Sequence, residues 1–551
     1  MPRVVPRQLP SRRFDPRSLA VCTAVALASL SAGCSGDSSD GAAGSRTTAS
    51  DPTSAASGPT TKATSGEPAS PTSSPEPSEP PPSDPPTSSG PAMHPDVPGA
   101  AALQAGESHP VEDPYYPETS NPEVDVLHYF LNLAYQEEVL SGTATVTFRA
   151  TKPTSRIRLD LSDALEIEKV TLDDARVSFG HKDNGLTMTT PKMKPGRTHT
   201  FVIKYSGRPA PVPAPSKRED MTAGLGWRTE SDGSVYTIQE PYGAFTWYPV
   251  NDHPSDEALY DARITTSSPD VGVFNGVLED KQVRGGLTTT RWHVDEPMAS
   301  YVTTLAIGPY EQYSGPTKSG LTITYWLMKR DQRLITPLRS EGTDAFDWLV
   351  EHAGPYPFSS LGVVVVGGEG TMETQTMITL DRGAARLQAF GASTLQHEMA
   401  HQWYGDSVTP TNWRGMWLNE GWATYLQQRY SAETQPKAPS DNPGPKVPGA
   451  QLTLRQVDNH ARAESGPPGD YKPDHFADIN VYIGPALMLR EIRKQVGERK
   501  FDQLVKAWPA QHENENVDRA EFTRWVNQFT GQDLTPLIDR WLDSRHTPHR
   551  H

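Results

Sequence analysis

The sequence contains very little cysteine. Its 551 residues include only Cys22 and Cys34, both close to the N-terminus. The rest of the chain therefore forms no disulfide bonds of its own and offers no thiolate ligand, so a bound metal would have to use histidine or carboxylate side chains. Residues 111–551 are numerous enough to be held together by a hydrophobic core instead.

An excess of basic residues is also missing. The chain has 51 Lys and Arg against 67 Asp and Glu, which gives a formal net charge of −16. Proteins that bind nucleic acids need a basic surface to displace counterions from the phosphates. The acidic balance therefore argues against nucleic acid as a partner.

The apolar stretch near the N-terminus, Leu19 to Gly33, is shorter than the roughly 20 residues that a transmembrane helix needs. It follows an arginine-rich start, which is typical of an export signal. The stretch ends in LSAGC, which resembles a bacterial lipobox, although the usual leucine three positions before the cysteine is Ser31. We expect residues 1–34 to be a lipoprotein-type signal peptide, with a lipid anchor at Cys34 on the extracytoplasmic face of the cell membrane. An ordinary signal peptide with an incidental cysteine is the alternative.

Aromatic residues are absent from Ser35 to His109. Serine, threonine, proline, glycine and acidic residues fill this stretch, so it cannot bury enough apolar surface to offset the conformational entropy of folding. We expect residues 35–110 to be a disordered linker that holds the folded part away from a membrane.

From residue 111 to residue 308, short stretches alternate between apolar and polar residues. Ile157, Leu159 and Leu161, for example, are separated by polar neighbours. A period of two places alternate side chains on opposite faces of a strand, so it predicts sheets with one exposed face. We therefore expect an all-β domain over residues 111–308.

Helical periodicity dominates the remainder, residues 309–551. LGVVVV at residues 361–366 predicts one buried strand. The Pro- and Gly-rich stretch from 434 to 475 predicts a long loop. The predicted helices span residues 393–404, 417–430, 483–496, 498–508 and 518–529.

Residues 397–406 read HEMAHQWYGD. Residues four apart on a helix share a face, so His397 and His401 can direct two imidazoles at one cation. Glu398 then points about 100° away from His397, beside the metal rather than on it. A metal-dependent hydrolase needs this combination of two nitrogen ligands and a nearby base.

Glu420 follows within WLNEGWATYL. Two antiparallel helices could bring it opposite the histidines, and a set of two His and one Glu leaves a fourth zinc position open for water. An exposed glutamate on a second helix is the alternative. Apolar neighbours such as Trp417 and Trp422 favour a buried position, and a buried carboxylate needs a partner.

These two motifs resemble those of the aminopeptidase N family of zinc metallopeptidases, which are gluzincins. The resemblance covers most of residues 111–551 and implies a multi-domain α+β fold. A saddle-like all-β domain would precede a thermolysin-like, mainly helical catalytic domain, in a short two-domain form. Further matching motifs, in the order of the family, are Gln239-Glu240-Pro241, Trp247-Tyr248-Pro249, Asp252-His253-Pro254, Pro297-Met298-Ala299-Ser300-Tyr301, Gly370-Thr371-Met372-Glu373 and Val481-Tyr482.

The resemblance implies a role for each matching residue of the metal site. His397, His401 and Glu420 would hold one Zn²⁺ per chain. Glu398 would act as the general base, and the Tyr482 hydroxyl would stabilise the oxyanion.

The resemblance also implies a substrate site. Glu240 and Glu373 would bind the free α-ammonium of a peptide, while Gly370 and Thr371 would offer backbone groups to it. Met372 belongs to the same substrate-binding element.

Three functions remain open on these grounds. The first is an exported zinc aminopeptidase acting on peptides with a free N-terminus. The second is a thermolysin-type endopeptidase, against which Glu240 and Glu373 argue because they would crowd a chain that continues past the first residue. The third is an inactive surface lipoprotein that kept the fold, against which the complete metal set argues.

Four positions depart from the family pattern. Thr374 stands in place of Asn, Gly415 in place of Asp, and Pro485 in place of Gly, while Ile238 occupies the usual position of a Gln. None is a metal ligand, so we expect these departures to affect the substrate pocket rather than the metal.

Overall fold

The computed structural model describes residues 98–549 apart from 217, 219–220, 387 and 435–451. The predicted signal peptide, Cys34 and most of the predicted linker lie outside the described residues. Within the described part, no helix is both long enough and apolar enough to cross a membrane.

Residues 98–110, which the composition assigned to the linker, are folded. They contain helix α2 (Ala100–Leu103), and Leu103 is buried. The hydroxyl of Ser108 donates a hydrogen bond of 2.9 Å to Oδ1 of Asp125 in the β domain. The predicted linker boundary at residue 110 is therefore wrong, because this segment docks through a few contacts that its composition does not reveal.

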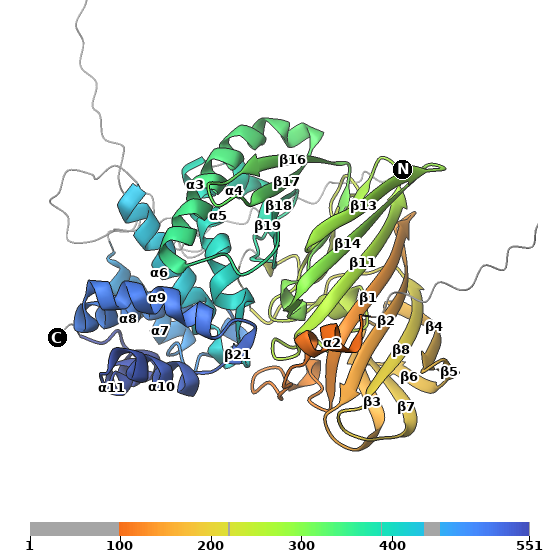
Figure 1. The fold of residues 1–551 in the computed structure, drawn as a ribbon, viewed down its shortest axis with the longest axis horizontal. Coiled ribbons are helices and arrows are strands. Elements are labelled where there is room, and N and C mark those ends of the chain that lie inside the picture. The colour runs from red at the N-terminus through yellow and green to blue at the C-terminus, as the bar shows by residue number, and fades with distance from the viewer. Residues whose placement is uncertain (1–97, 217, 219–220, 387, 435–451, 550–551) are drawn as a thin grey trace, which may run out of the picture. The chain divides into compact units, whose positions relative to one another are not determined.

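The β domain is built around an eight-stranded sheet, whose long strands lie side by side in Figure 1. The pair β1–β11 is parallel, and the other neighbours are antiparallel. In sheet order the strands are β13 (Val277–Arg284), β14 (Leu287–Met298), β11 (Ala258–Ser267), β1 (Val124–Gln136), β2 (Val139–Ala150), β8 (Thr198–Gly207), β4 (Leu165–Leu172) and β5 (Ala175–Arg176).

Two smaller sheets complete this domain. The predicted alternation is confirmed in β3, where Ile157 and Leu159 are buried between more exposed arginines. The three-stranded sheet has the order β3 (Thr154–Asp160), β7 (Gly185–Met193) and β6 (Ser178–Lys182). The four-stranded sheet has the order β12 (Val271–Phe274), β15 (Leu305–Gly308), β10 (Val235–Ile238) and β9 (Gly226–Thr229).

A separate sheet begins after residue 309. Its second, third and fourth strands are parallel to one another, and the predicted strand at 361–366 is its fully buried member. The order is β16 (Tyr310–Pro316), β17 (Thr322–Met328), β18 (Leu361–Val366) and β19 (Met377–Asp381). A short parallel pair, β20 (Val408–Pro410) and β21 (Glu515–Val517), lies further along the chain.

Helices make up most of the rest of this domain and pack together in Figure 1. All five predicted helices are present, with ends that differ by a few residues. The helices are α3 (Ile335–Ala353), α4 (Arg382–Arg386), α5 (Gln388–His401), α6 (Trp417–Thr434), α7 (Leu454–Ser465), α8 (Ile479–Val496), α9 (Glu498–Gln511), α10 (Arg519–Thr530) and α11 (Thr535–Asp543).

Helix α7 was not predicted, and it lies inside the stretch interpreted as a loop. Its buried face includes an ion pair of 2.9 Å between Asp458 and Arg462, both fully buried, so hydrophobic periodicity did not reveal it. The sequence does contain a start signal, because Thr453 and Gln456 form a capping box.

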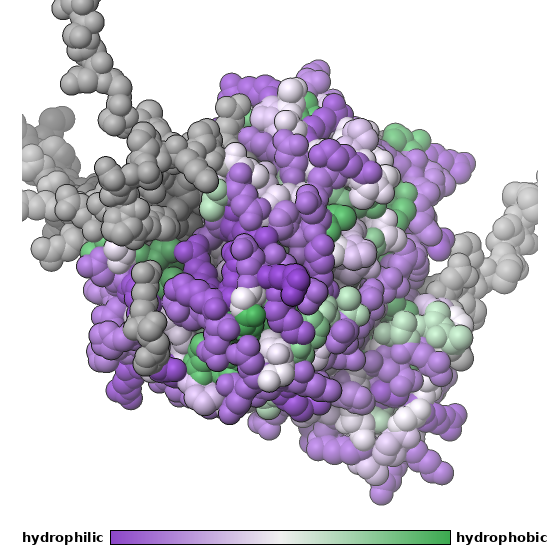
Figure 2. Space-filling model, turned by 60° about the vertical axis from the view of Figure 1, so that its left-hand side comes forward, coloured by the Kyte–Doolittle hydropathy of each residue, from purple (hydrophilic) through white to green (hydrophobic). Residues whose placement is uncertain are grey.

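The surface in Figure 2 is mostly hydrophilic, with scattered hydrophobic residues. Among the described residues, the large hydrophobic side chains classed as exposed are Phe179, Val277, Val283 and Leu452. The apolar residues of both domains are otherwise drawn into the interior, where they hold the elements that carry the site.

Candidate active site

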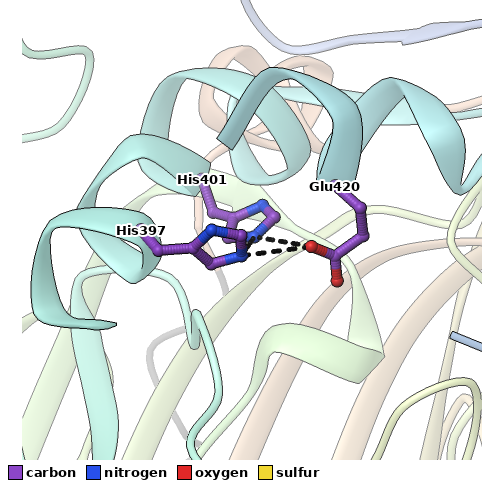
Figure 3. Close-up of side chains that lie close together, drawn as sticks. All are labelled: His397, His401 and Glu420. Carbon is purple, nitrogen blue, oxygen red and sulfur yellow. Dashed lines mark hydrogen bonds and ion pairs between the residues drawn. The ribbon is translucent and has the colours of Figure 1, made fainter. Parts of the chain in front are cut away.

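Three side chains from two helices converge at one point. His397 and His401 lie four residues apart on α5, and Glu420 reaches them from the first turn of α6 (Figure 3). Oε2 of Glu420 lies 3.1 Å from Nε2 of His397 and 3.5 Å from Nε2 of His401, and the two Nε2 atoms are 3.2 Å apart. The structure therefore brings together the three residues that the sequence predicted as ligands.

These separations suit a single zinc ion. Ligand atoms that each lie 2.0–2.1 Å from a tetrahedral zinc are about 3.3 Å from one another. All three side chains are buried, and they can form a group of potential metal ligands. Burial raises the pKa of the Glu420 carboxyl, but hydrogen bonds with His397 and then His401 outweigh this effect and lower it. This ligand therefore stays ionised.

The backbone after α5 orients His401. Nδ1 of His401 donates a 3.1 Å hydrogen bond to the carbonyl of Tyr404, which leaves Nε2 free to face the cluster. The carbonyl is presented by the π-type turn η8 (Gln402–Asp406), in which Gly405 has a φ of +139°. A Cβ at Gly405 would lie 3.1 Å from Nδ1 of His401, so both the conformation and the space require glycine.

The β domain supports this turn. Tyr301, from the PMASY motif, donates a 3.0 Å hydrogen bond to the carbonyl of Gly405. Asn419, next to the ligand Glu420, donates to the Tyr301 hydroxyl over 3.2 Å. A buried tyrosine of one domain thus connects the backbone near His401 with the helix that carries Glu420.

His397 has a different neighbour, which the sequence reasoning missed. Gln427 is seven residues after Glu420, so the two side chains share a face of α6. Gln427 is buried, and its contact with His397 opposes the lowering of the His397 pKa that burial causes. Its spacing from Glu420 was the available signal.

Glu398 lies beside the ligand set rather than within it. Its carboxylate, like that of Glu373, offers an oxygen within 4.8 Å of a ring nitrogen of His401. Burial raises the pKa of Glu398 well above its ordinary value, and the charge of Glu373 adds to this effect. The position is that of a base next to the metal site.

Glu240 and Glu373 approach the same site from different domains. Both are buried, and each has an oxygen, Oε1, without a hydrogen-bond partner among the described residues. Burial and then the charge of Glu373 raise the pKa of Glu240 well above its ordinary value. Two neighbouring buried carboxylates of this kind create a demand for a cationic ligand.

The other predicted substrate residues lie in the segment before β19. Gly370 lies next to the side chain of Ile238, whose atoms would be 3.6 Å from an added Cβ. The hydroxyl of Thr371 donates to Asp381 over 3.0 Å, and Met372 exchanges backbone hydrogen bonds with Thr379. The segment is thus anchored directly before Glu373.

Tyr482 lies in the first turn of α8. Its ring stacks on that of His397, with centroids 6.2 Å apart and an angle of 20° between the planes. Arg218, from a β-domain loop, donates a 3.1 Å hydrogen bond to the Tyr482 hydroxyl. No local motif around Arg218 indicated this contact.

The structure shows the surroundings of two positions that depart from the family pattern, Ile238 and Thr374. Gln239 does not replace a pocket residue at 238, because its side chain is buried and bonded to Ser300, Thr303 and Trp247. Thr374 is also buried and donates its hydroxyl to the carbonyl of Met377.

The departures at Gly415 and Pro485 concern packing. A Cβ at Gly415 would approach Cβ of Pro410 to 2.9 Å, so a larger side chain would not fit there. Pro485 lies inside α8, and an added Cβ at Gly421 would lie 2.5 Å from Cβ of Pro485. Gly421 of α6 therefore packs closely against Pro485 of α8, the helix that carries Tyr482.

Comparisons with known proteins match both domains of the chain. The model of the peptidase M1 N-terminal domain matches residues 125–302, and that of the peptidase family M1 domain matches residues 351–541. Leucine aminopeptidase 2 of Vanderwaltozyma polyspora is 25% identical over 445 residues, which are 74% of this chain and 63% of that protein. Aminopeptidase N of Streptomyces lividans is 27% identical over 277 residues, which are 45% of this chain and 31% of that protein. The chain thus spans less than two thirds of the length of these relatives.

The match to a solved structure extends over more of both chains. The M1 zinc metallopeptidase from Deinococcus radiodurans is 25% identical, with a TM-score of 0.67 over 80% of this chain and 99% of that protein. A variant of that protein was solved with a bound Tyr-Ser-Ala substrate. Two models of M1 peptidase domains match the chain in sequence order, and a solved M1 zinc metallopeptidase shares its fold, so the chain belongs to the M1 family of peptidases.

Proposed function

We propose that this protein is an exported zinc aminopeptidase that hydrolyses the N-terminal peptide bond of peptides. The observation that carries the proposal is the pair of buried carboxylates, Glu240 and Glu373, each with an unpartnered oxygen. They lie beside a complete set of two His and one Glu. A free α-ammonium is the cation that would satisfy both carboxylates while its peptide bond reaches the metal site.

The chemistry follows from the residues present. His397, His401 and Glu420 would hold the metal, since their Nε2 atoms and a carboxylate oxygen face one another. When bound, zinc polarises the scissile carbonyl and lowers the pKa of a water molecule. Glu398 accepts the proton of the attacking water and delivers it to the leaving amine. Tyr482, stacked on His397, donates its hydroxyl hydrogen to the developing oxyanion.

The carboxylates set which bond is cut. A charge-assisted hydrogen bond from the ammonium to one carboxylate contributes about 1.5–3 kcal/mol. Glu373 and Glu240 together fix the first residue, so that the first peptide bond lies at the metal site. The similarity to leucine aminopeptidase 2 and aminopeptidase N supports this substrate class.

The test compares a peptide with a free amine and the same peptide N-acetylated. Wild type should cleave the free-amine form only. For Glu373→Gln, kcat/KM on the free-amine peptide should fall roughly 10- to 100-fold. The preference for the free-amine peptide over the acetylated one should therefore largely disappear. Glu369→Gln is the matched control, because Glu369 is exposed and lies in the same segment. Equal cleavage of both peptides by wild type would exclude the aminopeptidase and favour the thermolysin-type endopeptidase.

The membrane attachment is a separate part of the proposal. It is supported by the LSAGC string that ends at Cys34 and by the aromatic-free segment that follows. Cys34→Ala should release the protein from the membrane fraction or block its maturation. A wild-type protein that is soluble and carries an unmodified cysteine would contradict the lipid anchor without affecting the proposed activity.

A further inference from the structure

Arg218 belongs to a loop between β8 and β9 that is closed at its base. Val212 and Leu225 exchange two backbone hydrogen bonds of 2.9 and 2.7 Å there. Within the loop, the Arg218 amide donates to the Ser216 hydroxyl over 3.2 Å, and the Arg218 carbonyl accepts from Met221 over 3.1 Å. Both neighbours are buried, so the backbone of Arg218 is fixed on the β domain.

The side chain of Arg218 crosses to the catalytic domain. Its Nη1 donates to the Tyr482 hydroxyl over 3.1 Å and to the carbonyl of Ala477 over 2.5 Å. The carbon of the guanidinium lies 5.9 Å from the centre of the Tyr482 ring. The second contact fixes the guanidinium at the start of α8, so the first is geometrically well defined.

A phenol has one hydrogen to donate, whereas a guanidinium can only donate. The contact with Arg218 therefore uses the Tyr482 oxygen as an acceptor, and the phenol hydrogen must point elsewhere. Glu420, one of the predicted metal ligands, is the other hydrogen-bonding neighbour of Tyr482, and its carboxylate can accept the phenol hydrogen. The phenol hydrogen is thus directed toward the metal site, where a substrate oxyanion would compete with Glu420 to accept it.

We propose that Arg218 is a positioning residue for catalysis: it holds the Tyr482 hydroxyl by donating to its oxygen, and so directs the phenol hydrogen at the transition state. This inference rests on the proposed function. The β domain would then contribute two charged groups to the reaction. Glu240 would bind the substrate ammonium, and Arg218 would position Tyr482. Arg218 should therefore act on turnover through Tyr482, and on substrate binding hardly at all.

The experiment measures kcat and KM on an amino-acyl amide for wild type and its variants. Arg218→Ala should lower kcat by roughly tenfold and leave KM within about twofold, since the contact acts in the transition state. Arg218→Lys should recover part of the loss, because one ammonium can still donate to Tyr482. The double variant Arg218→Ala/Tyr482→Phe should be no slower than Tyr482→Phe alone by more than about twofold, since the two residues act as a unit.

A binding measurement provides a readout that does not depend on turnover. A phosphinic dipeptide analogue mimics the tetrahedral oxyanion. Arg218→Ala should lower the affinity for this analogue and should leave the affinity for a free amino acid unchanged. The matched control is Arg208→Ala, an exposed β-domain arginine paired with Glu138. That variant should behave as wild type in both measurements.

The outcomes separate this inference from the proposed function. A wild type that fails to cleave the amide would overturn the proposed function itself. If wild type is active and the losses of the two single variants multiply in the double variant, the positioning role is wrong. A rise in KM that appears for peptides with a free C-terminus and disappears for amides would also overturn it, because Arg218 would then bind the substrate carboxylate.

Discussion

The pKa values of two buried glutamates in one site are shifted in opposite directions by their immediate neighbours. Hydrogen bonds with His397 and His401 overcome burial and lower the pKa of Glu420, whereas burial and the charge of Glu373 raise the pKa of Glu398. Sequence spacing places both carboxyls near the predicted metal site, and under the proposed function Glu420 would be a ligand and Glu398 the general base.

Replacing Glu398 with Gln tests this division of roles. The amide keeps the size and polarity of the side chain but cannot accept the proton of water. We expect kcat to fall by between about 10² and 10⁴-fold while zinc content stays at one per chain. Metal analysis and steady-state kinetics on the same preparation measure both quantities.

Glu351→Gln is the control for this change, because Glu351 is an exposed residue of α3. It should leave both quantities unchanged. Loss of zinc from Glu398→Gln would show that Glu398 holds the metal rather than a proton.

Among the elements, the turn η8 orients His401, the predicted ligand at the end of α5. The helix ends at His401, and the non-helical residues Tyr404 and Gly405 bring a carbonyl back to the ring of His401. Hydrogen bonds of this kind orient a metal-bound imidazole, and their loss typically costs 10- to 100-fold in metal affinity.

Gly405→Ala should therefore weaken zinc binding. The new Cβ would lie 3.1 Å from Nδ1 of His401 and would require a φ of +139°, so the turn must shift and the carbonyl of Tyr404 moves away. We expect the zinc affinity to fall by about 10- to 100-fold in a competition with a chelator. Gly180→Ala, where no atom lies within 4 Å of the new methyl, is the control. An unchanged affinity for Gly405→Ala would mean that the turn does not orient His401.

At the scale of the whole molecule, buried polar contacts join the β domain to the catalytic domain. Oδ2 of Asp113 accepts from the Trp413 amide over 2.9 Å, and Tyr301 donates to Gly405. Glu257 accepts a 3.0 Å hydrogen bond from Asn516 in β21. Each contact joins the two domains, and the one made by Tyr301 supports the turn next to His401.

Glu257 makes this connection sensitive to pH. Burial raises its pKa from an ordinary 4.5 to about 7. Between these values the folded protein keeps a proton that the unfolded chain has released, so the contribution of this carboxyl to stability falls as pH rises and is constant above about 7. The fall is roughly 1.4 kcal/mol per pH unit within the window.

Glu257→Gln removes this titration. The melting temperature of wild type relative to the variant should therefore decrease from pH 5 to pH 7 and change little above it. Thermal unfolding of both proteins across this range measures the difference. Parallel curves from pH 5 to pH 8 would contradict a raised pKa for Glu257.

Local sequence patterns were sufficient to predict part of the fold and of the site. Helical spacing placed His397 and His401 on one face, and the apolar setting of Glu420 indicated its burial next to them. Strand alternation located Ile157 and its neighbours, and the run at residues 361–366 located β18. These features repeat every two or about four residues, so a short window contains the information.

The tertiary structure decided what depends on contacts between distant segments. Arg218 is 264 residues from Tyr482 in the chain, and Tyr301 is 104 residues from Gly405. Residues 98–110 and helix α7 fold through buried polar contacts that hydrophobic patterns do not register. No window of sequence contains both partners of such a contact, because the partners meet only when the sheets and helices pack. Packing therefore decided how the predicted metal ligands are oriented, although sequence spacing had already identified them.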